Sequence, residues 1–293
     1  MTLDFVDTHV HFHDLRSRDL TYDWLRPGGD PAEADVLGEY GAIRAERYRA
    51  EDFRQETRFS GVEAAVHVQA ALGSRDPVAE TAWLTEAHRR TGFPHAIIGH
   101  VDLASPDAIE TLNRHLEFPL FRGVRDLGLA GAYRDPQCDR SLAGLDRHGL
   151  VLCDATELPR VDEAVALVAR HGAVTYCVDH AMMPMRRTAE YFAEWRRCLD
   201  KVAALPNAVI KISGLGQVDH DWTVDSLRPW VQACIEAFGT DRAFFGTNWP
   251  VDRLYSSYGD VVSAYAEICA DFSPEERRAL LSGNARRVFG IDQ

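Results

Sequence analysis

Short apolar segments alternate with longer amphipathic segments along most of the chain, and this alternation limits the fold more than any other feature. Eight strands are predicted, at residues 4–11, 62–70, 94–103, 119–126, 149–156, 173–181, 208–215 and 243–249. Several are almost continuously hydrophobic, which is typical of strands buried on both faces of a parallel sheet. The pattern predicts an α/β fold, a single-domain (β/α)8 TIM barrel over residues 1–293. A doubly wound sheet is the alternative, but no G-x-G-x-x-G motif follows a predicted strand.

Helix-length amphipathic segments lie between the strands. We expect helices at residues 77–91, 106–117, 159–171, 187–205, 223–238, 258–271 and 274–289. The last one opens with a predicted capping box, in which Ser273 is the N-cap and Glu276 is the third helical residue.

Residues 15–60 interrupt the alternation. They are expected to form an excursion from the carboxyl end of the first strand, with a charged helix at 37–55. Excursions at that end form the substrate mouth of a barrel. Tyr22 and Trp24 either line this mouth or pack the excursion onto the barrel, and the sequence leaves both readings open.

Charge and composition exclude several classes of partner. The net charge of −13 argues against binding to nucleic acid or to an anionic membrane surface. No apolar run approaches the ~20 residues of a membrane span, and the N-terminus lacks a signal-peptide pattern. The six cysteines form no C-x-x-C pair, so reduced, buried thiols in a cytoplasmic protein are expected.

Polar residues gather at the carboxyl ends of the predicted strands, where barrels place their chemistry. They are His9 and His11 on the first strand, Gln69 on the second, Arg122 and Arg125 on the fourth, Asp179 and His180 on the sixth, Lys211 on the seventh and Asn248 on the eighth. An unpaired buried polar group costs ~1–3 kcal/mol, so chance burial does not explain such a ring. The sequence therefore predicts a site at this end of the barrel.

Several other polar residues are expected to lie outside the site or to have a structural role. His13 lies past the end of its strand and is expected in solvent or behind the site, while Asp7 either orients an imidazole or caps a turn. Histidines on predicted helices and loops are expected at the surface; they are His88, His95, His115, His148, His171 and His220.

Taken in order, the motifs resemble those of the amidohydrolase superfamily. They are His-x-His, "VQA", "FRGVRD", "VDH", "VIKISGL", "FFGTNWPVD" and the ending "LSGNARRVFGI". The resemblance spans essentially the whole chain and is greatest to the amidohydrolase 2 group, the branch of sugar-lactone and 2-pyrone-4,6-dicarboxylate lactonases. It implies a hydrolase that opens a small lactone or related cyclic ester by attack of water at the carbonyl. It places His9, His11 and His180 around that carbonyl.

The resemblance also bears on metals. Many members of the superfamily hold two metal ions bridged by a carboxylated lysine on the fourth strand, but the lysines of this chain are Lys201 and Lys211. A lysine-bridged binuclear centre is therefore excluded. His9, His11 and His180 could hold one divalent ion, zinc or manganese, with an open position for water. No metal is obligatory, because members of this branch often work without a tightly bound one.

The chain departs from the branch at Asn248, where an aspartate is usual. An amide cannot take a proton from water, so either His180 or Asp252 is expected to be the base. The residues expected to bind substrate, a polar or anionic small molecule, are Gln69, Arg122, Arg125, Trp24, Tyr22 and Lys211.

Asn248 also keeps other readings open. A non-hydrolytic reaction on the same scaffold, either decarboxylation of an unsaturated or aromatic acid or isomerisation of a lactone, needs no activated water. A barrel that binds a ligand without catalysis is a further alternative. The sequence leaves the oligomeric state open, a homo-oligomer included.

Overall fold

Eight parallel strands form the centre of the computed structural model, which describes residues 4–26, 37–38 and 40–292. In ring order they are β1 (Phe5–Val10), β4 (Val62–Val68), β5 (Ala96–His100), β6 (Phe121–Arg125), β7 (Val151–Asp154), β8 (Thr175–Val178), β9 (Ala208–Ile212) and β10 (Ala243–Phe245). The last strand returns to the first: Thr8 Oγ1 donates to the carbonyl of Phe245 over 2.7 Å, and the His11 amide donates to Trp249 over 2.7 Å. The predicted barrel and its eight strands are confirmed.

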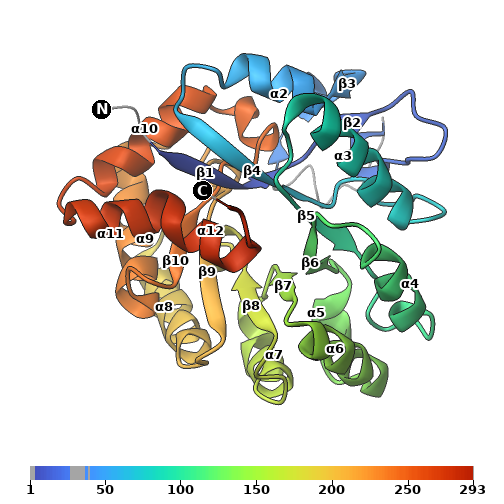
Figure 1. Cartoon of the computed structure of the whole chain (residues 1–293). Helices are drawn as coiled ribbons and strands as arrows, with labels where there is room; N and C mark the ends of the chain where they lie inside the picture. Colours follow the sequence, from blue (N-terminus) through green and yellow to red (C-terminus); the bar gives the residue numbers. More distant parts are fainter. Residues whose placement is uncertain (1–3, 27–36, 39, 293) are drawn as a thin grey trace.

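Helices surround this ring (Figure 1). They are α3 (Val78–Thr91), α4 (Ala108–His115), α5 (Leu129–Ala132), α6 (Pro136–His148), α7 (Val161–Val168), α8 (Ala189–Ala203), α9 (Val224–Phe238) and α10 (Tyr258–Ile268). After them come α11 (Pro274–Arg278), a π-helical turn (Ala279–Gly283) and α12 (Asn284–Phe289), in place of the single helix predicted at 274–289. The predicted capping box of Ser273 and Glu276 is present. Among the described helices, none combines the length and apolar character that a membrane crossing requires.

Helix α6 lies where no helix was predicted. The Asp135 side chain accepts a hydrogen bond from the Gln137 amide over 2.7 Å, Pro136 is the first helical residue, and Gly149 ends the helix in a left-handed conformation. These are the usual start and stop signals of a helix. The Asp-Pro pair and the glycine were therefore the sequence signals that could have pointed to α6.

The excursion between β1 and β4 differs from the charged helix predicted at 37–55. Its described part contains a 3₁₀ turn (Asp23–Leu25), a second one (Tyr40–Ile43), and α2 (Ala50–Glu56); residue 39 lies outside the described residues. Arg47–Tyr48 forms β3, which pairs antiparallel with β2 (His13–Asp14). Tertiary pairing therefore overrides the local helical pattern until Ala50.

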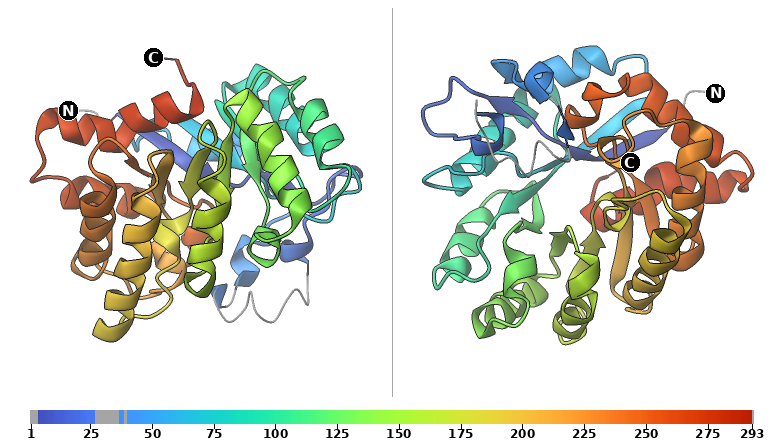
Figure 2. Two further views of the ribbon diagram at one scale, coloured as in Figure 1. Left: turned by 90° about the horizontal axis from the view of Figure 1, so that it is seen from below. Right: turned by 180° about the vertical axis from the view of Figure 1, so that it is seen from behind.

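The excursion and the chain ends lie at opposite ends of the barrel (Figure 2, left view). At the end with the chain termini, α12 covers the opening of the barrel. The aromatic ring of Phe289 on this helix has its centroid 5.7 Å from that of Phe244. Apolar side chains such as Val6, Val66 and Cys153 fill the interior above it. The polar residues are left at the opposite end, where the strands finish.

Candidate active site

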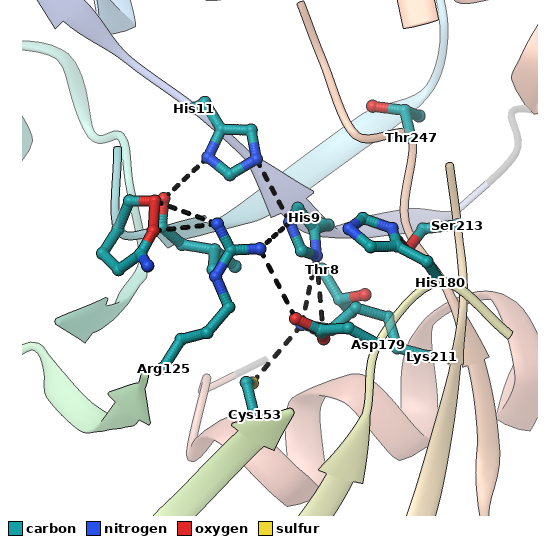
Figure 3. A network of polar contacts seen from close by, with 12 residues as sticks. Thr8, His9, His11, Arg125, Cys153, Asp179, His180, Lys211, Ser213 and Thr247 are labelled. Carbon is teal, nitrogen blue, oxygen red and sulfur yellow. Dashed lines mark hydrogen bonds and ion pairs between the residues drawn. The ribbon is translucent and has the colours of Figure 1, made fainter. Parts of the chain in front are cut away.

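A buried polar network occupies the carboxyl ends of β1, β6, β8 and β9 (Figure 3). His11 Nδ1 lies 2.8 Å from the carbonyl of Val68 and must donate to it, since a carbonyl only accepts. His11 Nε2 therefore carries the lone pair, and it lies 3.2 Å from His9 Nε2. Arg125 approaches the same His9 nitrogen to 3.2 Å with Nη1.

Lys211 and Asp179 form the centre of this network, and both side chains are fully buried. Lys211 Nζ lies 2.8 Å from Asp179 Oδ1, 3.4 Å from His9 Nδ1 and 3.5 Å from Cys153 Sγ. Asp179 Oδ2 is 3.6 Å from Arg125 Nη1. Burial alone would raise the pKa of Asp179, but the charges of Lys211, His180 and Arg125 outweigh burial and lower it.

His180 begins an unusual turn after β8. Residues His180, Ala181, Met182 and Met183 have φ angles of 53°, 51°, 56° and 46°, a left-handed conformation that costs non-glycine residues ~1–3 kcal/mol each. Trp195 Nε1 holds the turn by donating to the carbonyl of Ala181 over 2.9 Å. The turn aims the His180 side chain, which is fixed by a 2.9 Å hydrogen bond between Nδ1 and Ser213 Oγ.

His9 and His180 are both neutral near pH 7. Burial, followed by the neighbouring positive charges, lowers the pKa of His9 well below its ordinary value. Burial also lowers the pKa of His180, to about 4, against the opposing effect of Asp179. Neutral imidazoles keep a lone pair for a proton or a metal ion.

Asn248 and Asp252 follow β10. Asn248 is left-handed, with φ of 58°, and its Nδ2 donates to Asp252 Oδ1 over 3.2 Å. Burial raises the pKa of Asp252 to about 7, although hydrogen bonds from Asn248 and the Gly216 backbone partly oppose the shift. Asp252 therefore holds the Asn248 carboxamide in place.

Asp7 fulfils neither of its two expected roles. It accepts hydrogen bonds from the Thr247 amide over 2.9 Å, the Thr247 hydroxyl over 2.6 Å and Tyr258 Oη over 3.0 Å. It also accepts from the backbone amide of His9, not from an imidazole. Asp7 thus ties β1 to the residues that follow β10.

A cavity of about 560 Å³ opens above the network. Its polar lining residues are His11, Gln69, Arg125, Glu157, His180, Gln217 and Asn248, and its apolar ones include Trp24, Leu37, Leu72, Leu127, Met183 and Val251. Trp24 is held by a 2.8 Å hydrogen bond from Nε1 to the carbonyl of Ala70. Tyr22 is absent from the described lining and packs in the excursion with Leu20 and Leu25.

The structure moves two other predicted substrate contacts away from the cavity. Arg122 donates from Nε to the carbonyl of Phe289 over 2.9 Å, at the opposite end of the barrel. It is the second residue of β6 whereas Arg125 is the last, and parallel strands all begin at that opposite end. Lys211 lies beneath the histidines and does not reach the described lining.

The buried histidines outside the network serve the fold. His13 is fully buried, with Nε2 3.0 Å from the carbonyl of Ala45. His115 and His171 are buried, contrary to expectation; His115 bonds Thr81 Oγ1 and the carbonyl of His100. All six cysteines are free and buried, as predicted.

The residues that fit a single divalent ion differ from the predicted set. His9, Asp179 and His180 offer ligand atoms within 4.8 Å of one another, and two neutral imidazoles with one carboxylate suit zinc. His11 is not in this group. Asp179 replaces it; the sequence placed Asp179 in the ring of polar residues but not among the metal ligands. The alternation of inward-facing residues along this segment, Cys177 and then Asp179, was the available signal.

Comparison with known proteins agrees with this geometry. Residues 6–291 match the amidohydrolase family model. The chain is 33% identical to the uncharacterized protein y4mH of Sinorhizobium fredii, over 98% of both chains. It is 30% identical to an L-fucono-1,5-lactonase of Burkholderia ambifaria, over 98% of this chain and 96% of that protein.

A solved structure shows the same architecture. It is an amidohydrolase from Burkholderia multivorans with bound zinc, which superposes with a TM-score of 0.82 at 27% identity, over 98% of this chain and 99% of that one. The family model covers nearly the whole chain, and the barrel fold is the one that this structural neighbour shares. The chain therefore belongs to the amidohydrolase family and is a hydrolase.

Proposed function

We propose that this hydrolase opens the ring of a small lactone by attack of water on the carbonyl. The observation that carries the proposal is the position of His180, a neutral, fixed imidazole that lines the same cavity as His11, Arg125 and Asn248. The similarity to an L-fucono-1,5-lactonase supports the reaction class.

The charges around the cavity favour the lactone of a neutral sugar acid over a carboxylated lactone. Arg125 is the one cationic residue of the described lining, and its Nη2 already donates to Gln69 Oε1 over 2.8 Å. Glu157 adds a negative charge. The residues that the structure does not describe between 27 and 39 include no lysine or arginine.

Gln69 is the best-placed donor for a substrate hydroxyl. Its side chain is fully buried, its Oε1 is held by Arg125, and its Nε2 has no hydrogen-bond partner. An unsatisfied buried donor costs ~1–3 kcal/mol, which a ligand hydroxyl would recover on binding. Gln69 therefore supports recognition of a polyhydroxylated ring.

In the proposed mechanism, the chain's own groups activate the carbonyl and the water. Arg125 faces the developing negative charge, since fixed donors in a buried site stabilise an oxyanion strongly. Asn248 holds the water through its carboxamide, with Asp252 orienting that group. His180 Nε2 accepts the proton, because His180 lines the cavity whereas Asp252 is absent from the described lining.

A divalent ion held by His9, Asp179 and His180 would supply Lewis-acid polarisation of the carbonyl. His180 would then serve as a ligand, which leaves Asp252 as the base. The pH profile of kcat/KM separates the two assignments. A rate already at its plateau at pH 6 supports His180, and a midpoint near pH 7 supports Asp252.

The test is proton release, followed with a pH indicator, over a panel of aldono-, uronic- and muconolactones. Metal-stripped enzyme is compared with zinc- and manganese-loaded enzyme. His180→Asn should lose ~10²–10⁴-fold in kcat, the usual contribution of a general base, and the exposed His148→Asn is the matched control. Equal activity of His180→Asn and the wild type would refute the assignment.

Decarboxylation or isomerisation remains the second candidate, because Asn248 cannot take a proton from water. Product analysis distinguishes it. Hydrolysis incorporates labelled solvent oxygen into the product, whereas decarboxylation releases carbon dioxide. No proton release from any lactone, together with carbon dioxide release from unsaturated acids, would replace the lactonase proposal.

A further inference from the structure

Two groups of metal-ligating atoms share the carboxylate of Asp179. The upper group consists of His9, Asp179 and His180, and the lower group consists of Cys153, Cys177 and Asp179. In each group the ligand atoms lie within 4.8 Å of one another. The upper group is the one that would hold a divalent ion in the proposed function, and the lower group has no role there.

The lower group is built into the barrel wall. Cys153 and Cys177 are register partners on the adjacent strands β7 and β8, and both are fully buried. Two thiols and a carboxylate in one place suit a soft divalent ion such as zinc or cadmium. These three side chains therefore have the chemistry of a second metal site.

Lys211 lies between the two groups. Its Nζ contacts the shared carboxylate at 2.8 Å, His9 Nδ1 of the upper group at 3.4 Å and Cys153 Sγ of the lower group at 3.5 Å. The side chain is fully buried and comes from β9, so its charge cannot move into solvent without leaving the barrel interior. A fixed cation thus faces donor atoms of both groups.

We propose that the Lys211 ammonium serves as the cation shared by the upper and lower groups and prevents soft divalent ions from binding to the lower group, Cys153, Cys177 and Asp179. A divalent ion in that group would lie close to a fixed positive charge. Two unit charges 4 Å apart repel by ~4 kcal/mol at an effective dielectric constant of 20, and a divalent ion carries twice that charge, so binding is weakened by more than about a thousandfold. Removing the ammonium should therefore open the lower group to a soft ion.

The test is a cadmium titration of the full-length protein, because a cadmium–thiolate bond has its own ultraviolet absorption band. Lys211→Met should show this band and bind cadmium more than about a thousandfold more tightly at the thiols than the wild type. Lys201→Met is the matched control, since Lys201 is the other lysine of the chain and pairs with Asp162 on the surface. It should behave like the wild type.

Two further variants make the result specific. Adding Cys153→Ser to Lys211→Met should abolish the band although the other five cysteines are still present. Lys211→Gln carries the same prediction with a neutral side chain that still hydrogen-bonds the carboxylate, so the test does not depend on one variant folding. Folding is checked by circular dichroism and thermal scans.

The outcomes are independent of which ring the enzyme opens. A cadmium–thiolate band in the wild type at the affinity of Lys211→Met would overturn the proposal. So would a folded Lys211→Met and a folded Lys211→Gln that both lack the band. Gain of the band in either variant and its loss with Cys153→Ser would establish Lys211 as the group that blocks the site.

Discussion

The ion pair between Lys211 and Asp179 makes a quantitative prediction about stability. Both side chains are fully buried, with Nζ and Oδ1 2.8 Å apart. Breaking a buried pair from one side costs ~3–5 kcal/mol, because the remaining charge is left without its partner. Asp179→Asn should reach the upper part of this range, since it leaves the charge of Lys211 and also removes the partner of Arg125.

Lys211→Met should cost less than Asp179→Asn, because Asp179 still lies 3.6 Å from Arg125. The double variant leaves neither charge of the pair and should lose less stability than Asp179→Asn alone, because only Arg125 is then left without its carboxylate partner. At ~2.1 cal/mol/K of unfolding entropy per residue, each single loss should lower the melting temperature by ~5–8 °C.

The wild type, the two single variants and the double variant form a double-mutant cycle. Urea unfolding of these four proteins at pH 7, together with thermal scans, measures it. The sum of the losses in unfolding free energy of the two single variants should exceed the loss of the double variant by several kcal/mol. If instead the two single losses add within ~0.5 kcal/mol, the side chains do not interact and the account of this pair is wrong.

Three further predictions test other parts of the molecule. Arg122→Ala should cost ~1–2 kcal/mol of stability through its lost hydrogen bonds and leave kcat unchanged, whereas Arg125→Ala should lose activity; kinetics and melts on both variants check this. Trp195→Phe leaves the carbonyl of Ala181 without its hydrogen-bond donor, so kcat should fall by up to ~10²-fold with KM nearly unchanged. Adding Ala181→Gly should restore part of the lost kcat, because glycine adopts this turn without strain. No recovery of kcat would contradict a role of the indole in the turn. Burial raises the pKa of Asp252 from 3.8 to about 7, so the native state holds this proton more tightly and stability should fall as the pH rises from about 4 to 7; urea melts of Asp252→Asn should show a flatter slope, and an unchanged slope would refute the shift.

The barrel was predictable because strands buried on both faces are hydrophobic over their whole length. The ring of polar residues was predictable for a second reason, because parallel strands all end at the same edge of the sheet. The structure separates Arg122 from Arg125 only by their places at the start and end of β6. Where a strand begins is the least certain part of such a pattern, so Arg122 was assigned to the wrong end.

Other parts depended on tertiary structure. The pairing of Arg47–Tyr48 with His13–Asp14 joins segments far apart in sequence, which no local pattern reveals. The left-handed turn from His180 contains no glycine, so its conformation had no sequence signal, although it sets the direction of the His180 side chain. The central place of Asp179 follows from that turn and from Lys211 on another strand.

Closure of the ring sets the moment at which activity can arise during synthesis. Asp7 and Thr247, which bring β1 to the residues after β10, are 240 positions apart. His9 and His11 leave the ribosome long before Asn248 does, and they meet it only when the first and last strands pair. A chain interrupted before residue 248 can therefore fold several βα units, yet it lacks the complete water-binding side of the site. Catalysis in this barrel is a property of the finished ring, and refolding should restore secondary structure before it restores turnover.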